Sequence, residues 1–180
     1  MIILFGASAS GKTEIAKYLA KKYGIIKAVT HTTRPIRNGE INGVDYHFVT
    51  KSQFLQMEEN NELVESTFYN GNLYGCSRKE VADNKCIVVD PAGLNHFQQL
   101  GSSRIIAFYL DASESKREER MKSRGDKDED IAKRLENDRL TFNADVKEKA
   151  DIIIRVEDQT IDQLGDFIYE QYQKILAKVS

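Results

Sequence analysis

The feature that most constrains the fold is a glycine-rich segment near the N-terminus, GASASGKT, at residues 6–13. It matches G-x-x-x-x-G-K-[ST], in which glycines let the backbone curl so that successive N–H groups face phosphate oxygens. The apolar run at residues 2–5 precedes it and is typical of a strand buried on both faces of a parallel sheet. Apolar residues follow at helical spacing before a stop at Gly24: Ile15, Ala16, Leu19 and Ala20. This order predicts an α/β fold, a P-loop three-layer core with a parallel sheet flanked by helices.

The same loop predicts a binding site for the phosphates of ATP. Lys12 is expected to reach the transferred phosphate, and Thr13 to present its hydroxyl to Mg²⁺, which bridges phosphate oxygens. The predicted ATP-binding residues are Ser8, Ala9, Ser10, Gly11, Lys12 and Thr13. The alternative is a chance glycine-rich turn, and the position of the motif between a buried strand and an amphipathic helix argues against it.

Composition limits the classes of partner. The 180 residues are 41% hydrophobic and 30% charged with a formal net charge of -2, which gives no general attraction to nucleic acid. Cys76 and Cys86 lack the spacing of a zinc site or a disulfide framework, so a reducing compartment fits. The N-terminal apolar run is too short for a signal peptide or a membrane span. We therefore expect a cytoplasmic protein, monomer or homodimer, that binds small-molecule nucleotides and neither nucleic acid nor membrane.

The segment at residues 30–48, THTTRPIRNGEINGVDYHF, indicates the phosphoryl acceptor. It resembles the start of the monophosphate-binding lobe of guanylate kinases, S-x-T-T-R-x-x-R-x-G-E-x-x-G-x-D-Y-x-F. The likeness continues through Phe54, ELVE at residues 62–65 and GNLYG at residues 71–75. The resemblance implies Mg²⁺-dependent transfer of the γ-phosphoryl group of ATP to GMP or dGMP. It also implies a small mixed β monophosphate-binding lobe and a helical lid beside the core.

The resemblance further implies an acceptor site whose arginines and tyrosines hold the GMP phosphate and whose glutamate, Glu65, reads the guanine. The implied GMP-binding residues are Thr30, Arg34, Arg37, Tyr46, Glu65, Tyr74, Cys76 and Asp90. Guanidinium groups pair bidentately with phosphate oxygens, and a carboxylate can accept two hydrogen bonds from guanine. From the residues alone, the alternative interpretation is a turn-rich surface hairpin region. Its predicted elements are strands at residues 45–49 and 63–68 and a helix at 52–59.

Asp90 follows an apolar strand at residues 87–89, at the sheet edge where open α/β folds bind ligands. It could belong to the Mg²⁺ shell together with Thr13, or bind an acceptor hydroxyl. Because Pro91 follows it, Asp90 could equally be the N-cap of a helix. The two interpretations are compatible and both stay open.

A heavily charged stretch follows another apolar strand at residues 105–110. Three of its arginines fall at i, i+3 and i+7 and share one helix face: Arg117, Arg120 and Arg124. Residues 126–130 are expected to form an acidic turn, and Arg134 begins a similar face after it. By resemblance, Arg120, Arg124 and Arg134 act with Lys12 and Arg34 as catalytic cations that stabilise charge in the transition state. The alternative is a pair of solvated helices laced by salt bridges.

The rest of the chain completes one undivided domain. A strand at residues 151–155 precedes an amphipathic helix whose apolar residues are assigned to the core: Leu164, Phe167, Ile168, Tyr172, Ile175 and Leu176. The resulting division has a core of residues 1–29, 84–115 and 145–180. The acceptor-binding lobe is residues 30–83, and the lid is residues 116–144.

The sequence departs from the guanylate kinase pattern at several positions. Ala9 replaces a P-loop glycine, Cys76 replaces a serine that contacts guanine, and Val88 replaces the first acid of D-x-D. Residues 155–157 stand where the family has an Asn-Asp pair near the adenine. Two alternatives therefore remain: a P-loop kinase for another nucleoside monophosphate or a phosphorylated sugar, and a non-catalytic guanylate-kinase-like binding module.

Overall fold

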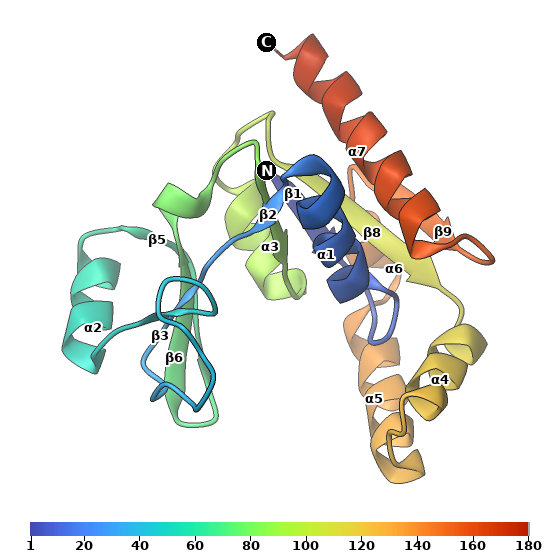
Figure 1. The fold of residues 1–180 in the computed structure, drawn as a ribbon, viewed down its shortest axis with the longest axis horizontal. Helices are drawn as coiled ribbons and strands as arrows, with labels where there is room; N and C mark the ends of the chain where they lie inside the picture. The colour runs from blue at the N-terminus through green and yellow to red at the C-terminus, as the bar shows by residue number, and fades with distance from the viewer. Residues whose placement is uncertain (180) are drawn as a thin grey trace.

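The computed structural model describes residues 1–179 as a central sheet with helices on both faces, from which two arms extend (Figure 1). The five-stranded sheet has the order β2-β7-β1-β8-β9, and all its neighbouring strands are parallel. Its strands are β1 (Ile2–Phe5), β2 (Ile26–Lys27), β7 (Lys85–Val88), β8 (Ile106–Ala112) and β9 (Ile152–Val156). The predicted parallel core is confirmed, and its strands end at one common edge.

Alternate residues of β1 face the two helical layers, as expected for a strand buried on both sides. Ile2 and Leu4 pack in one cluster with residues of α1 (Lys12–Tyr23) and α7 (Ile161–Lys178). Ile3 and Phe5 pack on the opposite face with α3 (Pro91–Gln98), and α6 (Ala144–Lys147) adds a residue at the edge of that cluster. The core therefore has the predicted three layers. The prediction was wrong for Phe167 of α7, which is exposed and not part of the core.

Local sequence signals set the ends of the helices on the first of these faces. Gly24 adopts the left-handed conformation with φ 67° and its N–H donates to the carbonyl of Ala20, which confirms the predicted helix stop. The helix α7 begins at a capping box, in which the Thr160 and Gln163 side chains each accept the other's backbone N–H. No helix within residues 1–179 is both long and apolar enough to cross a membrane.

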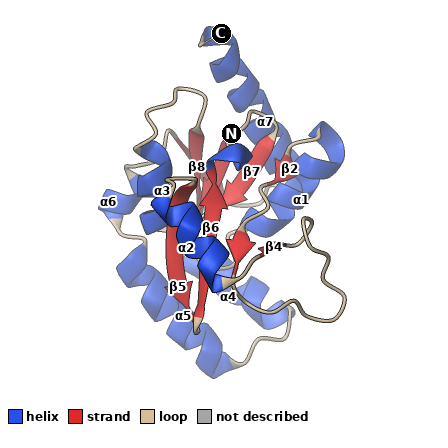
Figure 2. Cartoon of the chain, turned by 90° about the vertical axis from the view of Figure 1, so that its left-hand side faces the viewer, coloured by secondary structure: helices blue, strands red, loops and turns tan. Residues whose placement is uncertain are grey.

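The first arm, the lobe, is a second sheet of order β4-β3-β6-β5 in which parallel and antiparallel pairs mix (Figure 2). Its elements are β3 (His31–Thr32), β4 (His47–Phe48), α2 (Lys51–Glu59), β5 (Leu63–Tyr69), β6 (Asn72–Ser77) and the 3-10 turn Arg78–Glu80. The strand predicted at residues 45–49 is shorter than expected. Asp45 lies in a turn instead, because its carboxylate accepts the Ile41 N–H at 2.7 Å and its own N–H donates to the Ile41 carbonyl.

The second arm, the lid, consists of α4 (Glu114–Ser123) and α5 (Asp128–Thr141). The acidic turn predicted at residues 126–130 was wrong in its second half, since α5 already begins at Asp128. Asp128, Glu129 and Asp130 occupy the first turn of α5, where negative charge is favourable beside the helix dipole. The lid is therefore two full helices joined by a short connection.

Candidate active site

The glycine-rich loop leaves a row of backbone donors without partners. Gly11 has φ 103°, and a side chain at Gly6 would lie 2.8 Å from the Leu110 carbonyl oxygen, so both positions require glycine. The N–H groups of Ala9, Gly11, Lys12 and Thr13 have no hydrogen-bond partner within residues 1–179. They lie at the N-terminus of α1, where such groups and the helix dipole attract anions.

Lys12 is folded back onto its own loop. Its Nζ donates to the carbonyls of Gly6 and Ala7 at 2.7 Å each and to the Ser10 hydroxyl at 3.2 Å. Burial lowers the pKa of Lys12 to about 8, and the nearby Asp138 carboxylate opposes that shift. The Lys12 ammonium group is thus only partly solvated by the carbonyl oxygens of the loop. This favours an exchange of these partners for the oxygens of an anion such as phosphate.

A cavity of about 500 Å³ lies in front of this loop. It is lined by Ala9, Gly11, Lys12, Thr13, Glu14, Arg120, Arg124, Gln159, Thr160 and Ile161. Residues 159–161 precede and begin α7, and the sequence predictions missed them as part of the site. Their capping box marks a helix start, but only the parallel order of β1, β8 and β9 brings that start beside the P-loop.

Of the three predicted lid arginines, Arg120 and Arg124 line this cavity and Arg134 does not. Arg120 lies nearest the loop, and its Nη1 donates to the Ala9 carbonyl at 3.1 Å. Arg124 and Arg134 both bind the carboxylate of Asp126, at 2.6 and 3.0 Å, and both are exposed. Arg117, predicted on the same helix face, is buried instead. Salt bridges therefore hold two of the lid arginines, as the alternative interpretation predicted, and the catalytic role of the three arginines stays a prediction.

A smaller cavity of about 200 Å³ lies between the lobe and the end of β7. It is lined by Thr30, Glu65, Ser66, Thr67, Ile87, Val88, Val89, Asp90, Ala92, Gly93 and His96. Three of the predicted acceptor-site residues, Thr30, Glu65 and Asp90, therefore come together here. Asp90 does not share a cavity with Thr13, the other predicted metal ligand.

Glu65 is aimed into this cavity by an irregularity in its strand. The register between β5 and β6 shifts between Leu63 and Glu65, which is typical of a bulge and turns one side chain. Its Oε1 accepts the Cys76 N–H at 3.1 Å, and burial raises the pKa of the carboxyl. The Cys76 thiol itself is fully buried in the hydrophobic cluster, and burial raises its pKa to about 12. Cys76 thus contacts Glu65 through its backbone while its side chain packs in the core.

Asp90 is the N-cap of α3, with Oδ1 accepting the Gly93 N–H at 2.8 Å. Pro91 occupies the start of that helix, as the Asp-Pro pair predicted. The cap also fixes the carboxylate at the wall of the cavity that contains Glu65. Capping and a ligand contact are therefore compatible at this residue.

The other predicted acceptor residues gather elsewhere in the lobe, around Arg34. Its guanidinium binds Glu40 at 2.6 Å, and it lies 5.5 Å from the ring centroid of Tyr46. The Tyr46 and Tyr74 rings are 6.1 Å apart. The Arg37 guanidinium is exposed, while its backbone N–H donates to Glu40 at 2.8 Å. The sequence predictions missed Glu40. The hydrogen bond from Arg34 lowers the pKa of the Glu40 carboxyl.

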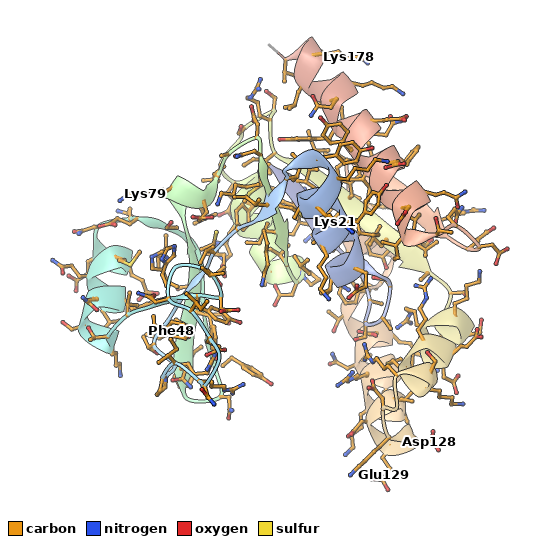
Figure 3. All side chains as sticks on the ribbon, viewed as in Figure 1. Lys21, Phe48, Lys79, Asp128, Glu129 and Lys178 are labelled. Carbon is orange, nitrogen blue, oxygen red and sulfur yellow. The ribbon has the colours of Figure 1, made fainter. Side chains whose placement is uncertain are left out.

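The predicted acceptor residues around Arg34 and the predicted lid arginines lie in separate arms on either side of the P-loop. Figure 3 places Phe48 in the lobe, and Asp128 and Glu129 at the far end of the lid, with α1 between the two arms. Within residues 1–179 no cluster of three His, Cys, Asp or Glu side chains could hold a metal ion.

The comparisons with known proteins all point to the same family. The family model described as guanylate kinase matches residues 1–174. The guanylate kinase of Anaplasma phagocytophilum is 29% identical over 99% of this chain and 90% of its own length. That of Schizosaccharomyces pombe is 36% identical over 77% of this chain and 73% of its own length. The crystal structure of the A. phagocytophilum guanylate kinase superposes with a TM-score of 0.66 at 25% identity, covering 97% of this chain and 84% of that one.

Proposed function

This chain belongs to the guanylate kinase family, and from that premise we propose how its residues transfer the γ-phosphoryl group of ATP to GMP. The products are GDP and ADP. The observation that supports the assignment of roles is the pairing of a donor cavity at the P-loop with an acceptor cavity at the lobe. The proposed division is a core of residues 1–29, 84–115 and 145–180, an acceptor lobe of 30–83 and a lid of 116–144.

At the donor end, the free N–H groups at the start of α1 bind the ATP phosphates. Lys12 exchanges its carbonyl partners for phosphate oxygens, and Arg120 and Arg124 add charge from the lid. Residues 159–161 form the outer wall of the same cavity, where the nucleoside of ATP lies. All of these groups act by position and charge, and none needs to change its protonation state during the transfer.

At the acceptor end, Glu65 accepts hydrogen bonds from the guanine N1–H and exocyclic amine, supported by Thr30 and Asp90. Arg34, Arg37, Tyr46 and Tyr74 hold the phosphate, as their grouping around one guanidinium supports. Glu40 keeps the Arg34 fork in place before the substrate arrives. The Cys76 backbone orients Glu65, so a thiol in place of a hydroxyl leaves the principal guanine contact intact.

Transfer requires the two arms to bring these anions together. An oxygen of the GMP phosphate attacks the γ-phosphorus while the bond to the bridging oxygen of ADP breaks. The charge spreads over the equatorial oxygens, and the cations of the loop and lid stabilise it there. Before the arms close, Arg124 and Arg134 are paired with Asp126, and we expect closure to bring them to the phosphates.

The residues present fit a bound Mg²⁺. The Thr13 hydroxyl is exposed beside Lys12 at the donor cavity, and Mg²⁺ characteristically takes one or two protein oxygens and fills its shell with phosphates and water. Thr13 would hold the ion, with Asp90 as a second candidate through the acceptor side. When bound, Mg²⁺ neutralises phosphate charge.

The test is a panel of acceptors in a coupled assay of ADP release. GMP, dGMP, AMP, CMP, UMP and ribose phosphates are compared by kcat/KM at fixed MgATP. We expect GMP and dGMP to be preferred, because adenine cannot offer two N–H donors to Glu65 in that arrangement. A preference for a non-guanine acceptor would overturn the proposed base contact. A chain that binds no MgATP at millimolar concentration in calorimetry would instead be a non-catalytic binding module.

A further inference from the structure

An ion pair between the two lid helices is almost completely buried. Arg117 on α4 and Asp138 on α5 lie 2.7 Å apart, and their side chains are 7% and 5% exposed. Most long charged side chains on such helices face water, as Arg124 and Arg134 do here. A buried pair of this kind gains little stability over an apolar pair of similar volume, because removing both charges from water is unfavourable. Stability alone therefore does not account for it.

The pair extends to the P-loop through Ser8. Asp138 Oδ2 accepts the Ser8 backbone N–H at 3.0 Å, and Oδ1 accepts the Ser8 hydroxyl at 3.1 Å. Arg117 Nη1 lies 3.4 Å from the Ser8 carbonyl oxygen and donates to it. Each polar group of Ser8 thus has a partner on the lid. Ser8, which the sequence predicted among the ATP-binding residues, does not line the donor cavity, and its N–H is occupied by Asp138.

The next residue of the loop is fixed by the lid as well. Ala9 has φ 59°, a left-handed conformation that is unfavourable for a residue with a side chain. Its methyl group packs against Met121, Ile131 and Leu135, the small core between α4 and α5. Its carbonyl accepts from Arg120 at 3.1 Å. Ser8 and Ala9 are therefore held in place by contacts to the lid and not by contacts within the loop.

We propose that Asp138, held in place by Arg117, is a positioning residue that keeps Ser8 and Ala9 in the phosphate-binding conformation and couples the lid to the ATP site. The inference rests on the proposed role of the loop in binding ATP. With Ser8 bound to Asp138, the residues whose N–H groups are free, Ala9, Gly11, Lys12 and Thr13, line the donor cavity. An apolar pair at the same place would pack the two helices but would leave both Ser8 donors without an acceptor.

The test is calorimetric titration of ADP, with circular dichroism melting as the check on folding. Asp138→Asn keeps the shape but places an amide N–H₂ against donors, and we expect ADP affinity to fall by about ten- to a hundredfold. The double variant Arg117→Met, Asp138→Leu removes the buried charges together and should fold cooperatively. It should nevertheless bind ADP as weakly as Asp138→Asn. In steady-state kinetics both variants should raise KM for ATP, with KM for GMP within about twofold of wild type.

A matched control is available on the same two helices. Arg139 on α5 binds Glu114 on α4 at the exposed surface and touches no residue of the P-loop. Glu114→Gln breaks this second link between the helices, and ADP affinity should stay within about twofold of wild type. The inference is overturned if the folded double variant binds ADP like wild type, or if Glu114→Gln loses as much affinity. Failure of wild type to bind ADP in the same titration would instead contradict the proposed function.

Discussion

Lys12 combines two properties that suit a phosphate-binding cation. It is half-buried, and its present partners are neutral carbonyl and hydroxyl oxygens of its own loop. A charged phosphate is a stronger acceptor than a carbonyl, so little reorganisation of the loop is needed when ATP binds. The proposed role of Lys12 is therefore to bind the donor and not the acceptor.

Lys12→Ala should therefore separate the two substrates. We expect kcat to fall by about a thousandfold, because a cation that stabilises transition-state charge is lost. GMP binding should be almost unchanged, since no acceptor-site residue contacts Lys12. Steady-state kinetics with both substrates varied measures this, and a loss of less than tenfold in kcat would count against the assigned role.

Glu65 gives the acceptor site a pH dependence. Burial raises the pKa of its carboxyl, so the protonated form persists above the usual range of a glutamate. Only the ionised form accepts two N–H groups from guanine, so KM for GMP should rise as pH falls through this raised pKa. In Glu65→Gln that dependence should vanish, and KM for GMP should be raised by about ten- to a hundredfold at neutral pH. A variant that keeps the wild-type pH profile would contradict the contact.

At the scale of elements, most of the helices and strands follow from local patterns. The buried strands, the helix stop at Gly24 and the Asp-Pro start of α3 were all predictable, because each depends on a few neighbouring residues. The short β4 and the early start of α5 were not. Asp45 lies in a turn because of its hydrogen bonds with Ile41, and the acidic residues in the first turn of α5 are stabilised by a helix dipole that only the complete helix creates.

The end of α1 offers a test of that local control. Gly24→Ala should lower the free energy of unfolding by about 1 kcal/mol, because φ 67° is unfavourable for alanine. A side chain there would meet no atom within 4 Å, so no clash adds to the effect. Gly24→Asn should lose less, since asparagine tolerates this conformation better. Chemical denaturation measures both, and equal stability of the alanine variant and wild type would contradict the assignment.

At the scale of the whole molecule, contacts between distant segments escaped prediction from sequence. Ser8 and Asp138 are 130 residues apart, and the loop at residues 159–161 reaches the P-loop only through the order of the sheet. The resemblance to guanylate kinases assigned Arg34, Tyr46 and Tyr74 to one arm and Arg120, Arg124 and Arg134 to the other. It did not indicate that Asp126 would hold two of the lid arginines, or that Glu40 would hold Arg34.

We propose that the donor site at the P-loop and the acceptor site at the lobe converge on one pair of phosphates. The most direct measurement is the calorimetric affinity of a molecule in which adenosine and guanosine are joined through a polyphosphate chain. We expect it to bind at least about tenfold more tightly than ATP or GMP, because the second site is then filled at a high effective concentration. Lys12→Ala and Glu65→Gln should each weaken that binding. An affinity equal to that of the better single nucleotide, and unchanged by one of the two substitutions, would contradict the account.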